Sequence, residues 1–201
     1  MQTSTNYTPN MHPFMSPRGS EAIATLQRGG IVLLPTVNLW QVVCSPDHPG
    51  TIRRQLELCP PGPQTRCEIL FPDLEMLRAR VPHLHPKLET LLAFHKRPLT
   101  VLVDDYPDAP YGLKDAEGRV AIRLIHDSFC HQLAEDLETP LVATTARAIG
   151  SPFLPLSFGR IRSDVLRGVD YVVRRRQKDL IAEAPAVVIR LNEKDEVVFV
   201  E

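Results

Sequence analysis

The chain has 201 residues, of which 43% are hydrophobic and 23% charged, with a formal net charge of −1. These values suit one globular domain with a sizeable core and argue against a disordered chain. No apolar run approaches the length of a membrane span and no signal peptide is recognisable, so we expect a cytoplasmic protein with no membrane contact.

Hydrophobic spacing predicts the secondary structure along the chain. Residues 1–18 are polar and are expected to form a flexible arm before a single domain over residues 19–201. The first helix is predicted from Ser20 to Gln27, with Ser20 as its N-cap and Gly29 as its stop. Further helices are predicted over residues 52–58, 74–81, 88–92 and 127–137. Strands are predicted over residues 31–34, 39–44, 67–71, 99–103, 120–124, 141–143, 171–173, 187–191 and 197–200.

Strands and helices alternate in the first part of this order, and strands cluster in the last part. Such an order is typical of an α/β (α+β) fold, in which helices flank a twisted, open, mixed β-sheet. Hydroxyl groups follow the predicted strand at 141–143, in Thr144 and Thr145. Strand ends of this kind are where open α/β sheets usually bind their ligands.

Four segments together resemble the YrdC-like family. Residues 31–41 follow a glycine turn and match its strand and Pro-Thr-Asp-Thr-x-Tyr-Gly motif, and residues 97–103 match its Pro-Gly-Pro-Leu-Thr strand. Arg123 matches the arginine of its Val-x-Val-Arg strand, and residues 144–150 match its Thr-Ser-Ala-Asn-x-Ser-Gly loop. The catalytic members of this family are threonylcarbamoyl-AMP synthases, which act in tRNA modification. The resemblance implies a YrdC-like sheet with a concave basic surface.

The chain departs from the family pattern where the family does its chemistry. Val37 and Asn38 replace an Asp and a Thr, and Arg147 and Ile149 replace the Asn and the second Ser of the loop. The family grips nucleotide phosphates with a Lys-x-Arg-Pro segment, whereas residues 59–65 contain no cation. Each change removes a charge or a hydrogen-bonding group that an adenylating enzyme needs.

The resemblance still points to a set of residues for a ligand or nucleotide. They are Thr36, Asn38, Arg66, Arg123, Thr144, Thr145 and Arg147. Arg123 lies in an apolar strand, where an unpaired charge is costly, so it meets either an anionic ligand or an acidic side chain of the protein. No catalytic residue is assigned.

Positive charge is concentrated in one part of the chain. Residues 147–178 contain eight Lys and Arg against two Asp, a formal charge of +6, which leaves −7 for the remainder. The predicted RNA-binding residues are loop cations beside strands: Lys96, Arg97, Arg174, Arg175 and Arg176. Solvated surface charge is the ordinary alternative for such runs. No aromatic residues interleave with them, so any RNA binding is expected to depend on shape and charge.

Cysteine and histidine spacing gives no metal signal. The four cysteines contain no Cys-x-x-Cys pair, and His83 and His85 lack a partner at ligand spacing between Pro82 and Pro86. No metal and no permanently bound cofactor are therefore predicted.

Two functions compete for this sequence. The first is a binding protein that holds transfer RNA, double-stranded RNA or a nucleotide, with its synthase activity weakened or lost. The second is an active L-threonylcarbamoyladenylate synthase that uses ATP and Mg²⁺ and relocated cations. The missing phosphate-gripping segment favours the first.

Overall fold

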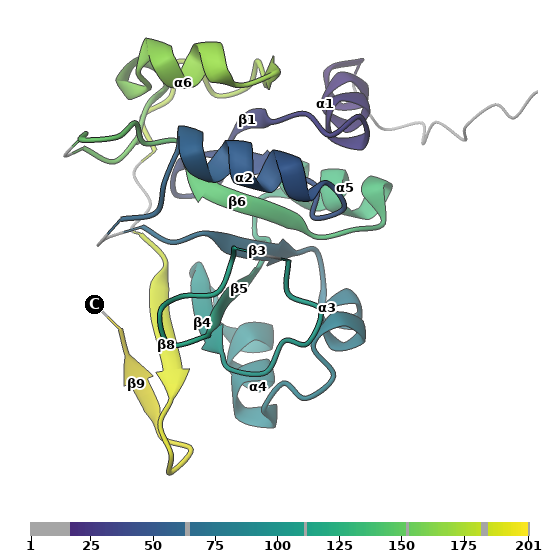
Figure 1. Ribbon diagram of the computed structural model, residues 1–201, viewed down its shortest axis with the longest axis vertical. Coiled ribbons are helices and arrows are strands. Elements are labelled where there is room, and N and C mark those ends of the chain that lie inside the picture. Colours follow the sequence, from purple (N-terminus) through teal and green to yellow (C-terminus); the bar gives the residue numbers. More distant parts are fainter. Residues whose placement is uncertain (1–16, 63–64, 111, 152, 182–184, 201) are drawn as a thin grey trace, which may run out of the picture.

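A mixed sheet of nine strands organises the chain (Figure 1). The structure is a computed structural model that describes residues 17–62, 65–110, 112–151, 153–181 and 185–200. The strands are β1 (Val32–Pro35), β2 (Trp40–Cys44), β3 (Glu68–Phe71), β4 (Leu99–Val103), β5 (Val120–Leu124), β6 (Leu141–Thr145), β7 (Tyr171–Val172), β8 (Val187–Leu191) and β9 (Val197–Phe199). Their order in the sheet is β7-β1-β2-β6-β3-β5-β4-β8-β9. The β1/β7, β3/β5 and β4/β8 pairs are parallel, and the other pairs are antiparallel.

Helices cover both faces of this sheet. They are α1 (Pro17–Gln27), α2 (Pro49–Leu58), α3 (Leu74–Arg80), α4 (Pro86–Phe94), α5 (Ser128–Leu137) and α6 (Ser163–Gly168), with a 3₁₀ turn η1 (Phe158–Arg160). The predicted α/β class is confirmed, and each predicted helix and strand has its counterpart. None of the described helices is long and apolar enough to cross a lipid bilayer.

The ends of the chain and one late helix differ from the prediction. Helix α1 begins at Pro17 rather than after Ser20, because a proline is well suited to the first helical position. The predicted arm therefore overlaps the first turn of α1, and residues 1–16 lie outside the described part. Helix α6 was not predicted: it has six residues, and only Val165 among them is buried.

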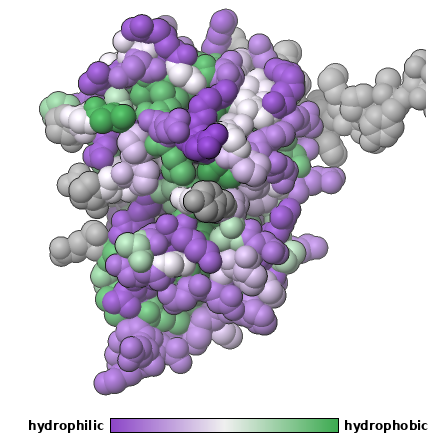
Figure 2. Space-filling model, in the orientation of Figure 1, coloured by the Kyte–Doolittle hydropathy of each residue, from purple (hydrophilic) through white to green (hydrophobic). Residues whose placement is uncertain are grey.

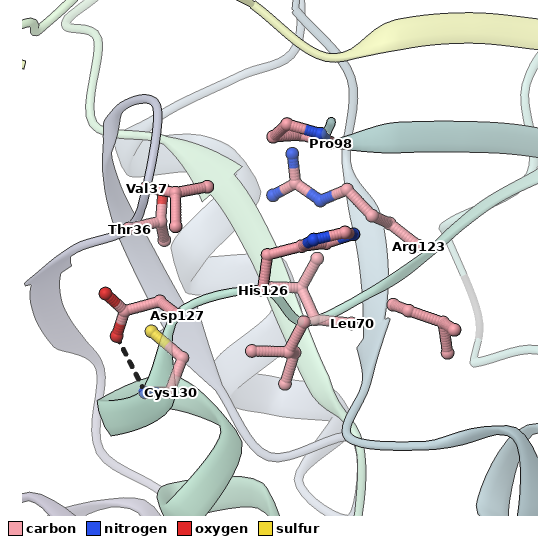
Figure 3. Close-up of a pocket in the computed structure, with 10 residues that line it drawn as sticks. Thr36, Val37, Leu70, Pro98, Arg123, His126, Asp127 and Cys130 are labelled. Carbon is pink, nitrogen blue, oxygen red and sulfur yellow. Dashed lines mark hydrogen bonds between the residues drawn. The ribbon is translucent and has the colours of Figure 1, made fainter. Parts of the chain in front are cut away.

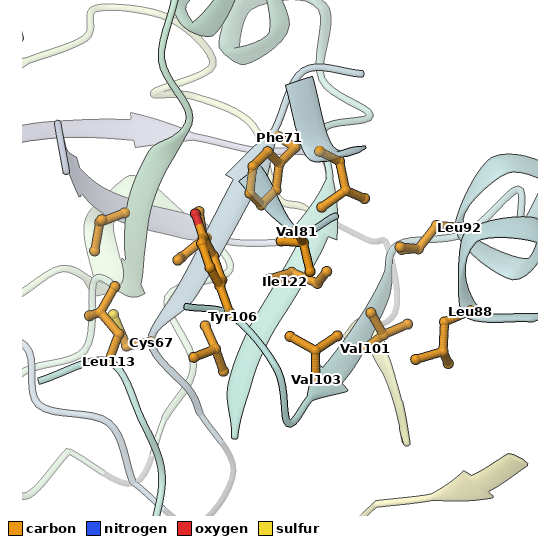
Figure 4. Close-up of a cluster of buried hydrophobic side chains, with 14 of the residues drawn as sticks. Cys67, Phe71, Val81, Leu88, Leu92, Val101, Val103, Tyr106, Leu113 and Ile122 are labelled. Carbon is orange, nitrogen blue, oxygen red and sulfur yellow. The ribbon is translucent and has the colours of Figure 1, made fainter. Parts of the chain in front are cut away.

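Side chains alternate along the paired strands and so divide the sheet into two faces. On the first face Ile69, Val101 and Ile122 pack with residues of α2, α3 and α4 in the cluster of Figure 4. The opposite face carries α1 and α5, whose apolar residues cover β1, β2 and β6. Among the described residues, this second cluster extends across the sheet from β1 to Leu70 of β3 and includes no residue of β5 or β4. The neighbouring part of this face, over β5 and β4, is where the polar site lies.

Much of the surface is polar, although Phe94, Ile149 and Phe199 are among the large hydrophobic side chains that are exposed. Hydrophilic side chains dominate the face seen in Figure 2, and hydrophobic ones show mostly between them.

Candidate functional site

A buried network of polar side chains lies on the α1/α5 face of the sheet, centred on an ion pair. Arg123 Nη2 of β5 is 3.2 Å from Glu68 Oε2 of β3, and the two side chains are only 6% and 10% exposed. Thr100 Oγ1 of β4 donates to Glu68 Oε1 at 2.5 Å. Gln41 of β2 accepts from Arg123 Nη2 at 3.2 Å through its Oε1. Both oxygens of the carboxylate are thus engaged, which is the condition under which a buried charge is tolerated.

The sheet register explains how four strands contribute to one network. Thr100 pairs directly with Arg123, and Glu68 lies two residues before Leu70, the partner of Arg123 on the other side. Gln41 is farther away, because β3 and β6 separate β5 from β2. In a flat sheet these two strands would be about 14 Å apart. Sheet twist and the long arginine side chain together account for the contact.

Arg123 also lines a small pocket at the end of β5. The pocket is formed by residues of four segments: Thr36, Val37, Leu70, Pro98, Arg123, Leu124, Ile125, His126, Asp127 and Cys130. Figure 3 shows the guanidinium of Arg123 near Pro98, Val37 and the ring of His126. The cavity of this pocket has a volume of about 10 Å³, room for about one water molecule. A nucleotide has no space there in this structure.

The predicted RNA-binding residues border this pocket from two loops. Lys96 and Arg97 are exposed and directly precede Pro98, which lines the pocket. Arg176 donates from Nη1 to the backbone oxygen of Thr36 at 3.0 Å. Arg175 is exposed, and its Cζ is 4.7 Å from the ring centroid of Phe129 in α5. We call His95, Lys96, Arg97 and residues 174–176 the cationic rim.

The pKa of His126 reflects both its burial and the positive charge near the pocket. Burial lowers the pKa of its imidazole, and the nearby Arg123 and His95 side chains lower that pKa further. His126 is followed by Asp127, whose Oδ1 caps α5 by accepting from the N–H groups of Phe129 and Cys130. The carboxylate of Asp127 therefore serves the helix. Positively charged side chains surround the pocket, and the ion pair with Glu68 neutralises the charge of the buried Arg123.

The two threonines of the 144–150 loop lie on opposite faces of the sheet. Thr145 pairs with Gln41, on the same face as Arg123, whereas Thr144 pairs with Val42, on the other face. The predicted ligand-binding set grouped Thr144 with Arg123 and Thr145, and this is wrong for Thr144, because one residue along a strand reverses the side-chain direction. Thr144 is 1% exposed, and its Oγ1 has no hydrogen-bond partner among the described residues.

Thr36 and Asn38 belong to the turn between β1 and β2. Thr36 lines the pocket, and its Oγ1 donates to the backbone oxygen of Leu39 at 2.8 Å. Asn38 is completely buried, and its Oδ1 is 3.2 Å from the Thr36 hydroxyl. Its Nδ2 has no acceptor within the described part of the chain. Asn38 thus shapes the turn, and it is not among the residues that line the pocket.

The remaining two predicted residues, Arg66 and Arg147, both lie near Gly62, away from Arg123. Arg66 lines a cavity of about 400 Å³ together with Gly62, Thr65 and Lys114. Arg147 Nη2 lies so close to Gly62 that a side chain at position 62 would collide with it. These two arginines border the segment that replaces the family's Lys-x-Arg-Pro. They do not line the pocket of Arg123.

His85 has a structural role in the described structure. Its Nδ1 accepts from the N–H of Lys87 at 3.1 Å, so it caps α4, and its Nε2 is 3.6 Å from Asp195 Oδ1. Among the described residues, no group of three or more His, Cys, Asp or Glu side chains is placed to hold a metal ion.

Comparison with known proteins places this site in a family. The Sua5/YciO/YrdC family model, described as telomere recombination, matches residues 24–200. The chain belongs to this family. Two curated members are named threonylcarbamoyl-AMP synthase. The one from Chromohalobacter salexigens is 27% identical over 136 residues, which is 67% of this chain and 74% of the relative. The one from Xanthomonas euvesicatoria is 25% identical over 134 residues, 65% of this chain and 72% of the relative.

Solved structures of the Sua5/YciO/YrdC family share the fold. E. coli YciO superposes with a TM-score of 0.77 at 18% identity, covering 94% of this chain and 92% of YciO. Sua5 of P. abyssi complexed with L-threonine gives 0.73 at 20% identity, covering 90% of this chain and 52% of that protein. The predicted resemblance is confirmed, and the chain is related to threonylcarbamoyl-AMP synthases.

Sequence reasoning missed the partners of Arg123 within this family fold. Glu68 and Gln41 were not recognised as site residues, although a glutamate inside an apolar strand is rarely buried unless it is paired. An arginine and a glutamate, each in an otherwise apolar strand, were the available signal. An ion pair with an acidic side chain is one of the two environments expected for Arg123, and Glu68 is the acid that forms it.

Proposed function

We propose that this chain binds structured RNA, such as transfer RNA or double-stranded RNA, through its cationic rim, with synthase activity weakened or lost. The observation that carries the proposal is that two basic loops adjoin residues of one small pocket: Arg97 directly precedes Pro98, and Arg176 donates to the backbone oxygen of Thr36. Exposed arginines and lysines around a concavity suit phosphate groups that follow a curved backbone. Four free, buried cysteines support a reducing, cytoplasmic setting.

The state of the pocket supports a synthase activity that is weakened or lost. Adenylate formation from ATP requires cations that offset charge on the transferring phosphates. Arg123 is the buried cation of this pocket, and its guanidinium is engaged by Glu68 and Gln41. Losing one preorganised donor costs about 10²–10³ in rate, and residues 59–65 supply no replacement.

RNA binding is tested by measuring the affinity for a transfer RNA at several salt concentrations. We expect micromolar or weaker, sequence-indifferent binding that weakens steeply with salt. Replacing Arg174, Arg175 and Arg176 together by alanine should remove most of it. Replacing the acid-paired Arg78 and Arg119 by alanine is the matched control and should change little. Binding that is absent at low salt, or unaffected by the triple substitution, contradicts the proposal.

The second candidate is an active synthase. Arg66 and Lys114, which line the 400 Å³ cavity, and Arg147, which lies beside Gly62, favour it, because they bring cations back near the segment that lacks them. Mg²⁺ would then be held mainly by the phosphates of ATP, since the described residues offer no cluster of ligands. Pyrophosphate release from threonine, bicarbonate and MgATP at about 1 s⁻¹ decides for this candidate. Loss of pyrophosphate release in Arg66→Ala would place the active site at this cavity.

A further inference from the structure

Glu68 stands where an anionic ligand would meet Arg123. Its carboxylate accepts a charged contact from the guanidinium and a hydrogen bond from Thr100. A phosphate or a carboxylate in the position of the Glu68 carboxylate would make the same two contacts. Glu68 is not among the residues that line the pocket; Arg123, which does line it, is the floor that an entering anion would meet. The ion pair is nine-tenths buried, so the carboxylate is a fixed part of the site rather than a surface charge that moves aside.

The charges around the pocket make this arrangement selective. The rim attracts anions through His95, Lys96, Arg97 and the 174–176 loop. At the floor, the Glu68 carboxylate already pairs with Arg123 and repels a second anion that approaches the same guanidinium. The free volume of about 10 Å³ beside the pair leaves room for about one water molecule. Attraction at the rim and exclusion at the floor therefore coexist within one concavity.

We propose that Glu68 is a resident anion that determines specificity: it occupies Arg123 in place of a ligand's phosphate or carboxylate and confines anion binding to the rim. The proposal rests on the proposed function, in which the rim binds RNA phosphates. It adds that small free anions and nucleotides are kept from the floor by a side chain of the protein itself.

The test removes the carboxylate and supplies a small anion in its place. Glu68→Ala leaves Arg123 unpaired beside a space that fits an acetate ion or an inorganic phosphate. We expect acetate and phosphate to raise the melting temperature of this variant well above the effect of chloride at equal ionic strength. The wild type should show no such difference. Ile122→Ala, a comparable truncation on the opposite face, is the matched control and should respond like the wild type.

The dependence on Arg123 separates specific binding from general salt effects. Glu68→Ala combined with Arg123→Met should lose the stabilisation by acetate and phosphate. If Glu68→Ala folds and these anions stabilise it no more than chloride does, the proposal is wrong. If it does not fold in chloride, refolding in acetate at equal ionic strength decides: we expect acetate to recover folded Glu68→Ala, and no recovery overturns the proposal.

The RNA measurement on the wild type keeps the two proposals apart. Glu68 lies below the rim, so Glu68→Ala or Glu68→Gln should bind transfer RNA with nearly the wild-type salt dependence. Failure of the wild type to bind RNA removes the proposed function, while rescue of Glu68→Ala by acetate would still establish the resident anion. The reverse result would remove the resident anion and leave RNA binding at the rim intact.

Discussion

The two faces of β3, β5 and β4 have different interiors, although they are made by adjacent residues. Glu68, Arg123 and Thr100 point to one face, and their chain neighbours Ile69, Ile122 and Val101 point to the other. On the apolar face each side chain stabilises the fold through the area that it buries, so the effects of substitutions on the free energy of unfolding are largely independent. On the polar face the groups satisfy one another, so removing one leaves another buried and unpaired. The polar face therefore behaves as a unit.

The largest expected effect comes from breaking the ion pair on one side. Arg123→Met leaves the Glu68 carboxylate buried without its cation, and we expect a loss of about 3–5 kcal/mol in the free energy of unfolding. Urea unfolding at neutral pH measures it. Combining Arg123→Met with Glu68→Leu removes both charges and should recover most of the loss. A single-variant loss below about 1 kcal/mol, or no recovery in the double variant, would show that the pair is not a unit.

A smaller effect is expected when a single group is removed from each face, a hydrogen-bond donor from the polar one and a methyl group from the apolar one. Thr100→Val keeps the shape but removes the donor to the Glu68 carboxylate, which should cost about 1.5–3 kcal/mol. Ile122→Val on the apolar face removes one buried methyl group and should cost about 0.5–1.5 kcal/mol. The same urea experiment compares them. Equal costs would mean that the polar face is no more sensitive than the apolar one.

This difference between the faces also explains why the sequence predicts the positions of the strands but not the contacts of the polar side chains. Apolar spacing locates the strands at 67–71, 99–103 and 120–124, because one buried face of each strand follows from local pattern. Helix α6 was missed, since its six residues bury only Val165. Spacing alone cannot show which of Thr144 and Thr145 faces Arg123. That depends on the register between β6 and β2, a contact between segments about a hundred residues apart.

The partner of Arg123 could not be chosen from sequence for the same reason. The chain has 24 acidic residues, and Glu68 lies 55 positions before Arg123. Only the parallel pairing of β3 with β5 brings the two within reach. Likewise, Arg66 and Arg147 were grouped with Arg123 by motif order, and the structure puts them beside Gly62 instead. Motif order identifies a family, whereas side-chain direction needs the three-dimensional register.

The apolar side of the comparison carries thiols that should stay protonated. Burial raises the pKa of Cys44 and of Cys59 from 9.0 to about 12. The folded protein thus holds these protons more tightly than the unfolded chain does. Their contribution to stability is complete below pH 9 and is lost as the pH rises from 9 towards 12. We expect stability to fall across that range, and slow alkylation by iodoacetamide at pH 8 until the protein unfolds. Alkylation at the rate of free cysteine would contradict this.

The smallest effect on stability is expected at the rim, where function should nevertheless respond. Arg175 is exposed and lies 4.7 Å from the ring centroid of Phe129. Arg175→Ala should cost about 0.5–1 kcal/mol of stability through the lost cation–π contact. If Arg175 contacts one RNA phosphate, the slope of log affinity against log salt should become shallower by about 0.9. Arg175→Lys keeps the charge and should keep the wild-type slope. A slope unchanged in Arg175→Ala would show that this residue serves α5 and not the RNA.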